Sequence, residues 1–118
     1  MANGDGIGTQ NLAGIERAVA HNQAYVAPND ILAAALAPSK PPSLFRVFAA
    51  FSLAGVLRAT VTRGGNTQVV DFNEGAALVA NGLYGFDLGA HDGDTVNFRY
   101  SVNATIVVLR VIEIVVGV

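Results

Sequence analysis

The last fifteen residues, ATIVVLRVIEIVVGV, contain only three polar side chains. A helix that spans a membrane needs about 20 predominantly apolar residues, and Arg110 and Glu113 interrupt this shorter run. Valine and isoleucine dominate the segment, and β-branched residues favour strands. The segment therefore predicts a long β-strand and no membrane span.

Both faces of this predicted strand are apolar, because successive side chains of a strand point to opposite sides. One face carries Ile106, Val108, Ile112 and Ile114, and the other carries Val107, Leu109, Val111 and Val115. The first face can enter a core. An uncovered second face would be prone to aggregation, so we expect Val107, Leu109 and Val111 to lie against a neighbouring subunit.

Short runs with alternating polarity fill the chain from residue 43 onward, separated by turn residues. Five of them precede the closing segment: LFRVFAAF, VLRATVTR, TQVVDF, LYGFDLG and TVNFRY. The pair Gly64-Gly65 suits a tight hairpin between the second and third runs, and Phe98 and Tyr100 are expected in the core with Ile106 and Val108. The pattern is typical of a mainly β chain, an antiparallel sandwich or barrel of about six strands.

The first 42 residues have a different character and carry all four prolines. Leu12, Ile15 and Val19 recur at spacings of three and four, which predicts a short helix, and Ile31 and Leu36 in PNDILAAALAPS predict a second one. The prolines of SKPPS form a stiff, extended hinge. We therefore expect a helical amino-terminal arm over residues 1–42 and a sandwich domain over residues 43–118. The five apolar residues of the arm would dock on the same subunit or on a neighbour.

Composition limits the function classes. Of the 118 residues, 52% are hydrophobic and only 14% are charged, so some apolar surface is expected to meet a partner. The net charge is -2 and the basic residues are scattered, which argues against a nucleic-acid ligand. The absence of cysteine excludes disulfides, thiolate metal sites and cysteine nucleophiles. The first eleven residues lack the basic and apolar regions of a secretory signal peptide.

Candidate chemistry is sparse. Asp92 and Asp94 in an acidic turn, with Asp87 nearby, could hold a calcium ion through carboxylate oxygens, although aspartate and glycine are also the ordinary residues of a tight turn. The two histidines, His21 and His91, lie in different parts of the chain. We identify no catalytic residue and expect no cofactor.

Asn103 begins the triplet Asn-Ala-Thr, which satisfies the acceptor pattern for N-glycosylation on a predicted turn. It is a possible glycosylation site if the protein lies outside a cell that glycosylates.

The run LYGFDLGAHDGDTVNFRYSVNATIVVLRVIEI, within residues 43–114, resembles the small β-sandwich structural proteins of virions, of the phage head-decoration or minor capsid type. The resemblance implies a non-enzymatic protein that forms trimers or a larger lattice with itself and contacts a major capsid protein, in a virion or extracellular assembly. Two other functions stay open: a carbohydrate-binding sandwich module on a larger particle, and a small hydrolase.

Overall fold

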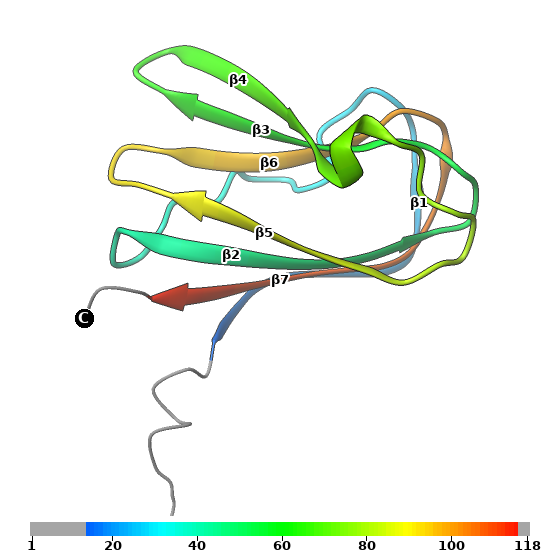
Figure 1. Ribbon diagram of the computed structural model, residues 1–118, viewed down its shortest axis with the longest axis horizontal. Helices are drawn as coiled ribbons and strands as arrows, with labels where there is room; N and C mark the ends of the chain where they lie inside the picture. The colour runs from blue at the N-terminus through cyan, green and yellow to red at the C-terminus, as the bar shows by residue number, and fades with distance from the viewer. Residues whose placement is uncertain (1–13, 116–118) are drawn as a thin grey trace, which may run out of the picture.

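The structure, a computed structural model, describes residues 14–115. Seven antiparallel strands form a sandwich of two sheets (Figure 1). The strands are β1 (Ile15–Tyr25), β2 (Ser43–Phe51), β3 (Leu57–Arg63), β4 (Asn66–Asp71), β5 (Tyr84–Ala90), β6 (Thr95–Tyr100) and β7 (Ala104–Val115), with a short 3-10 turn, η2 (Phe72–Gly75), after β4. One sheet has the order β1-β7-β2-β5 and the other the order β4-β3-β6.

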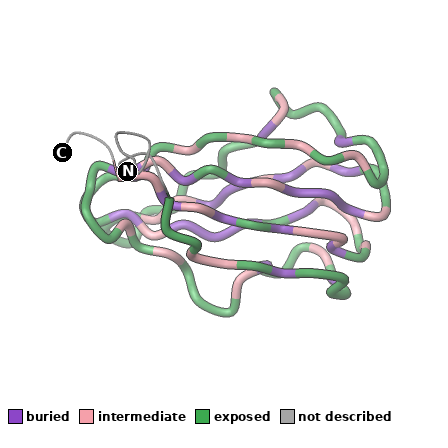
Figure 2. Tube along the Cα trace, turned by 90° about the horizontal axis from the view of Figure 1, so that it is seen from below, coloured by how far each residue is buried: buried purple, intermediate pink, exposed green. Residues whose placement is uncertain are grey.

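The six strands expected from residue 43 onward are confirmed as β2 to β7. Gly64 and Gly65 join β3 to β4 with φ values of 58° and 83°, a conformation that glycine adopts without steric cost. Phe98, Tyr100 and Ile106 are buried as expected, and the ring of Tyr100 stacks on Phe51 with 3.7 Å between centroids. Figure 2 shows buried and less buried residues alternating along the strands.

The predicted assignment of the β7 side chains to the two faces of the sheet is wrong, because a bulge shifts the alternation of the side chains along the strand. Ala50 of β2 pairs with Val108, whereas the next residue, Phe51, pairs with Ile106, so Val107 is an extra residue. Ile106, Leu109 and Val111 consequently share the core-facing side and are fully buried within this chain, and Val108 is half-buried on the other side. Leu109 and Val111 therefore do not form a contact with a neighbouring subunit.

The first predicted helix is also wrong over its described residues, which form strand β1. Residues 15–25 pair antiparallel with β7, from Ile15 opposite Glu113 to Tyr25 opposite Ala104. A bulge at Arg17 and a left-handed backbone at Asn22, with φ of 50°, break the alternation that would reveal a strand. Leu12 lies outside the described residues.

No helix forms in the second predicted segment either. Residues 31–36 run along the edge of β6, where Ile31 N–H donates to the Phe98 carbonyl and Leu36 forms a β-bridge with Val96. The side chain of Asn97 accepts from Leu32 N–H and donates to its carbonyl, both at 3.0 Å. These contacts with β6 replace the backbone hydrogen bonds that a helix would have made.

A buried polar cluster around Glu113 fixes the first described part of the chain, up to Ser43, to the sandwich. Glu113 on β7 is 0% exposed and accepts hydrogen bonds from Arg17, Ser39 and the Ser43 hydroxyl. Arg17 also donates to the carbonyl of Ala37, at 2.8 Å. Ala20, Tyr25 and Ile31 belong to the hydrophobic core of the sandwich. Residues 14–42 are therefore part of the sandwich and not a separate arm.

Over residues 14–115, no helix has the length and apolar character needed to cross a membrane.

Candidate functional site

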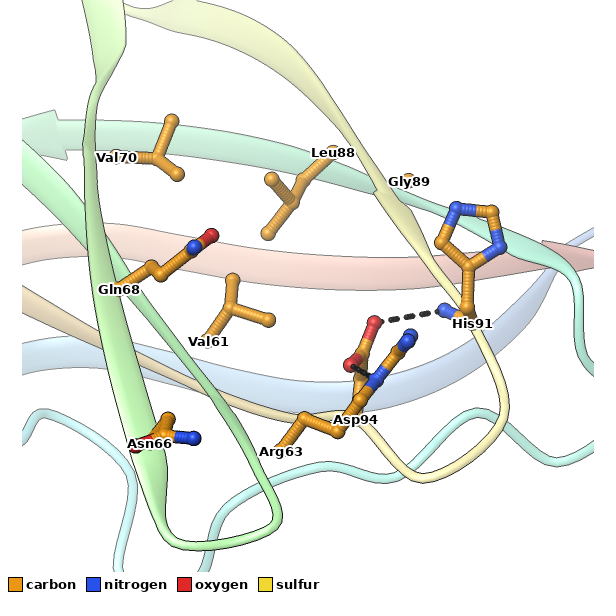
Figure 3. Close-up of a pocket in the computed structure, with 9 residues that line it drawn as sticks. All are labelled: Val61, Arg63, Asn66, Gln68, Val70, Leu88, Gly89, His91 and Asp94. Carbon is orange, nitrogen blue, oxygen red and sulfur yellow. Dashed lines mark hydrogen bonds and ion pairs between the residues drawn. The ribbon is translucent and has the colours of Figure 1, made fainter.

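The sandwich opens into a cleft between β4 and β5 (Figure 3). Its volume is about 470 Å³. Nine residues line it: Val61, Arg63, Asn66, Gln68, Val70, Leu88, Gly89, His91 and Asp94. They come from the β3–β4 hairpin on one side and from β5 and the β5–β6 turn on the other, as Figure 3 shows.

The register of the hairpin explains the lining of the cleft. Val61 of β3 lies opposite Gln68 of β4, and Ala59 lies opposite Val70, so these side chains share the face that looks toward β5. At one end of the sandwich the ring of Phe72, in η2, stacks on that of Phe86 in β5, with 4.9 Å between the ring centroids. The cleft opens away from this aromatic contact and has an apolar floor with polar side chains at its rim.

An ion pair forms part of this rim. Arg63 Nε donates to Asp94 Oδ1 at 2.7 Å, and the backbone N–H of His91 donates to Asp94 Oδ2 at 2.9 Å. The Asp94 side chain is only 7% exposed, whereas that of Arg63 is 56% exposed. The hydrogen bond from Arg63, followed by that from His91, lowers the pKa of Asp94 below its ordinary value. Asp94 therefore stays ionised and anchors the β5–β6 turn to the end of β3.

This pKa shift predicts a pH dependence of stability. A carboxyl whose pKa is lowered by folding stabilises the folded state above its unfolded pKa, about 3.9 for aspartate, and loses that contribution as the pH falls through the folded pKa. The free energy of unfolding of Asp94→Asn should therefore be below that of the wild type at pH 7, and the difference should shrink below about pH 4. Urea titrations from pH 7 to 2.5 measure it. Asp92→Asn, at the exposed neighbour in the same turn, is the control, and a difference independent of pH would contradict the assignment.

The side chains that line the cleft can form hydrogen bonds with a ligand, but they include neither a hydroxyl or thiol nucleophile nor an aromatic platform. The amides of Asn66 and Gln68 can each donate and accept, and the guanidinium of Arg63 can donate. None of the nine lining residues is a serine, threonine or cysteine that could act as a nucleophile beside His91. The His91 imidazole is also the only aromatic ring in the lining, so a platform for stacking on a sugar is not found there.

The calcium candidates do not come together. Within residues 14–115 no group of three or more carboxylate, histidine or cysteine residues is placed to hold a metal ion. Asp87 forms an ion pair with Arg46 on the neighbouring strand β2, at 2.9 Å. Asp94 pairs with Arg63, and Asp92 is exposed in the turn. The acidic turn is thus held through Asp94, by its ion pair with Arg63.

The expected interface residues fall into two groups. Ile31 is buried in the core of this chain, and Leu36 is half-buried against β6, so these two residues dock on their own subunit, which is one of the two alternatives expected for them. Ile15 and Val19 lie on the edge strand β1 and are 53% and 58% exposed. These two residues remain available for a contact between subunits.

Asn103 is exposed between β6 and β7, and its side-chain oxygen accepts a hydrogen bond from Ala27 N–H at 2.8 Å. The position is accessible as a glycosylation site requires, and glycosylation itself stays a prediction.

Two features were not predicted from the sequence. Arg63 and Asp94 lie 31 residues apart in the chain and are brought together only by the pairing of β3 with β6. The second feature is the apolar outer side of β2, with Leu44 and Phe48. The sequence could have predicted it, because LFRVFAAF is apolar on both of its faces.

Comparisons with protein families, with curated proteins and with solved structures gave no match to this chain.

Proposed function

We propose that this protein is a non-enzymatic structural protein that assembles with copies of itself. The observation that carries the proposal is the apolar outer face of the four-stranded sheet, the side opposite the core. We define this outer face by its apolar residues Val19, Leu44, Phe48, Val108, Ile112 and Ile114.

The strand register supports the position of these residues. Leu44 pairs with Ile114, and Phe48 pairs with Arg110, on the opposite side of the strands from the buried residues Val47 and Val111. All the residues of the outer face except Val19 are half-buried, because they shield one another on the sheet surface. Contiguous apolar surface of this kind marks interaction sites in soluble proteins.

The charges on the outer face are already paired within the chain. Arg46 binds Asp87 across β2 and β5, and Arg110 binds Glu16 across β7 and β1, at 2.9 Å and 2.6 Å. The four side chains sum to zero charge. A second copy can therefore approach this face without placing an uncompensated charge in the contact.

The size of the outer face is sufficient for a weak to moderate contact. The four strands have 7 to 12 residues. With a spacing of ~4.8 Å between strands and a rise of ~3.3 Å per residue, they give a face on the order of 600 Å². Two such faces bury on the order of 1,200 Å² in total, at the lower end of specific interfaces. Assembly through this face is then expected to depend on protein concentration.

The identity of the assembly is proposed from the resemblance of residues 43–114 to small virion proteins. We place the protein in a virion or extracellular assembly, with a major capsid protein as a second partner. The carbohydrate-binding and hydrolase alternatives have less support, because the cleft lining provides neither a stacking platform nor a nucleophile.

Val19→Lys tests the proposed contact. Placing an ammonium group in an apolar interface is costly, so self-association should weaken about tenfold or more, which corresponds to at least 1.4 kcal/mol. Val79→Lys is the matched control, because Val79 is 67% exposed and lies in the connection between β4 and β5. Sedimentation equilibrium measures both variants. Equal association of Val19→Lys and the wild type would show that the outer face is not the contact.

A further inference from the structure

Strand β4 forms an outer edge of the three-stranded sheet (Figure 1). All six of its residues, Asn66 to Asp71, are exposed. It pairs with β3 along one side in a continuous register, without a bulge. The backbone groups on its other side face outward, and such a row of donors and acceptors is a template for another strand.

The other edges of the sandwich are modified in ways that hinder strand addition. The edge strand β1 has a bulge at Arg17 and a left-handed residue at Asn22. The free edge of β6 is covered by residues 31–36. β5 has glycines at positions 85 and 89, and glycine in the interior of a strand weakens its pairing. Bulges and covering segments are among the usual means by which proteins block pairing at an edge.

β4 has none of these features. Its sequence, NTQVVD, contains no proline, glycine or lysine, and its threonine and valines favour strands. Asp71 at its end is the only charged residue, and its Oδ1 already accepts from Arg58 Nε at 2.9 Å. β4 is therefore the one edge among the described strands that is regular, uncharged over five residues and open.

We propose that β4 pairs antiparallel with β4 of a second copy, which joins the two three-stranded sheets into one continuous sheet. This inference rests on the proposed self-assembly and names one of its contacts. Antiparallel pairing of a strand with itself satisfies a two-fold axis, the commonest symmetry of soluble oligomers. The second copy is the occupant because each molecule then satisfies the same open edge of the other.

The faces of the sheet restrict the register of this pairing. Opposite residues in a continuous sheet point to the same face, and Thr67, Val69 and Asp71 alternate with the cleft-lining Asn66, Gln68 and Val70. In the register centred on Val69, that residue faces its own copy as a β-branched pair. Thr67 then lies opposite Asp71 of the second copy, so a hydroxyl group meets a carboxylate.

Cysteine cross-linking tests this register, because the wild-type chain contains no cysteine. In Val69→Cys the two Cα atoms would be about 4.5–5.5 Å apart, within the range that a disulfide spans. In Thr67→Cys the two thiols would lie four residues out of register, roughly 13 Å apart, too far for a bond. Both positions are exposed on the same face of the same strand, so each variant should fold like the wild type.

We expect oxidised glutathione to convert most of Val69→Cys into a disulfide-linked dimer at concentrations where the wild type associates, and to leave Thr67→Cys mainly unlinked. Equal linking of the two variants, or no linking of Val69→Cys, would overturn the proposed pairing. If Val69→Cys fails to link while Val19→Lys weakens association, the edge pairing fails and the outer-face contact stands. If Val69→Cys links while Val19→Lys has no effect on association, the edge pairing stands and the outer-face contact fails.

Discussion

Replacing Leu109 by Asp is expected to unfold the protein. Leu109 is 0% exposed and lies on β7 between β1 and β2, in the centre of the core. The change removes a buried leucine side chain, which alone costs about 2–5 kcal/mol, and it buries a carboxylate without a partner. The free energy of unfolding should fall by on the order of 5 kcal/mol or more, comparable to the whole stability of many domains.

Circular dichroism and urea titration measure this effect, with Leu83→Asp as the control. Leu83 is 69% exposed, so the same substitution there should change the free energy of unfolding by about 0.5 kcal/mol or less. A folded Leu109→Asp protein that only fails to assemble would contradict the core position of β7. That outcome would instead support a contact with a neighbouring subunit.

The second large effect is expected for Glu113→Ala. Burial alone would raise the pKa of Glu113, but hydrogen bonds from Ser43, Ser39 and Arg17 together lower it below the ordinary value of a glutamate. The glutamate is therefore ionised at neutral pH. Its removal leaves the partly buried Arg17 without its carboxylate, and it leaves the N–H and hydroxyl of Ser39 without their acceptor, so the loss should be about 3–5 kcal/mol.

Glu16→Ala is the matched control for this variant. Glu16 lies on β1 and pairs with Arg110, but both side chains are about half exposed. Exposed ion pairs contribute about 0–1 kcal/mol, so Glu16→Ala should be nearly neutral in the same urea titration. Comparable losses for the two glutamate variants would show that the buried cluster does not fix residues 14–42 to the sandwich.

The strands from residue 43 onward could be predicted because each has a regular alternation and a clear turn after it. The acidic turn at Asp92 and the glycine pair at Gly64 give such signals. Alternation located Phe98 and Tyr100 in the core correctly. It failed in β7, because the extra residue Val107 lies in a bulge, and nothing in a run of valines and isoleucines marks where a bulge will occur.

The first 42 residues could not be read from local patterns, because their structure depends on distant partners. Ile15 and Val19 have a helical spacing, yet the segment is held as a strand by its pairing with β7. The segment from Ile31 to Leu36 has the alanines of a helix, yet the side chain of Asn97 fixes the backbone of Leu32. Tertiary contacts outweigh propensity in both segments.

The cleft could not be predicted for the same reason. Its rim depends on the meeting of Arg63 with Asp94, and its opening depends on the β3–β4 hairpin, which extends past the aromatic contact of Phe72 with Phe86. The outer face, in contrast, could have been recognised from the two-sided apolar pattern of β2 together with that of β7. Two adjacent strands that are apolar on both faces predict a sheet that is covered on both sides.

The molecular mass of the unmodified protein in solution, measured over a range of concentrations, tests the proposed self-assembly most directly. The monomer has a mass of 12.2 kDa. The outer face and the open edge of β4 predict a mass that rises above this value as the concentration increases through the micromolar range. A constant mass of one monomer up to millimolar concentration would contradict the proposal that the protein assembles with itself.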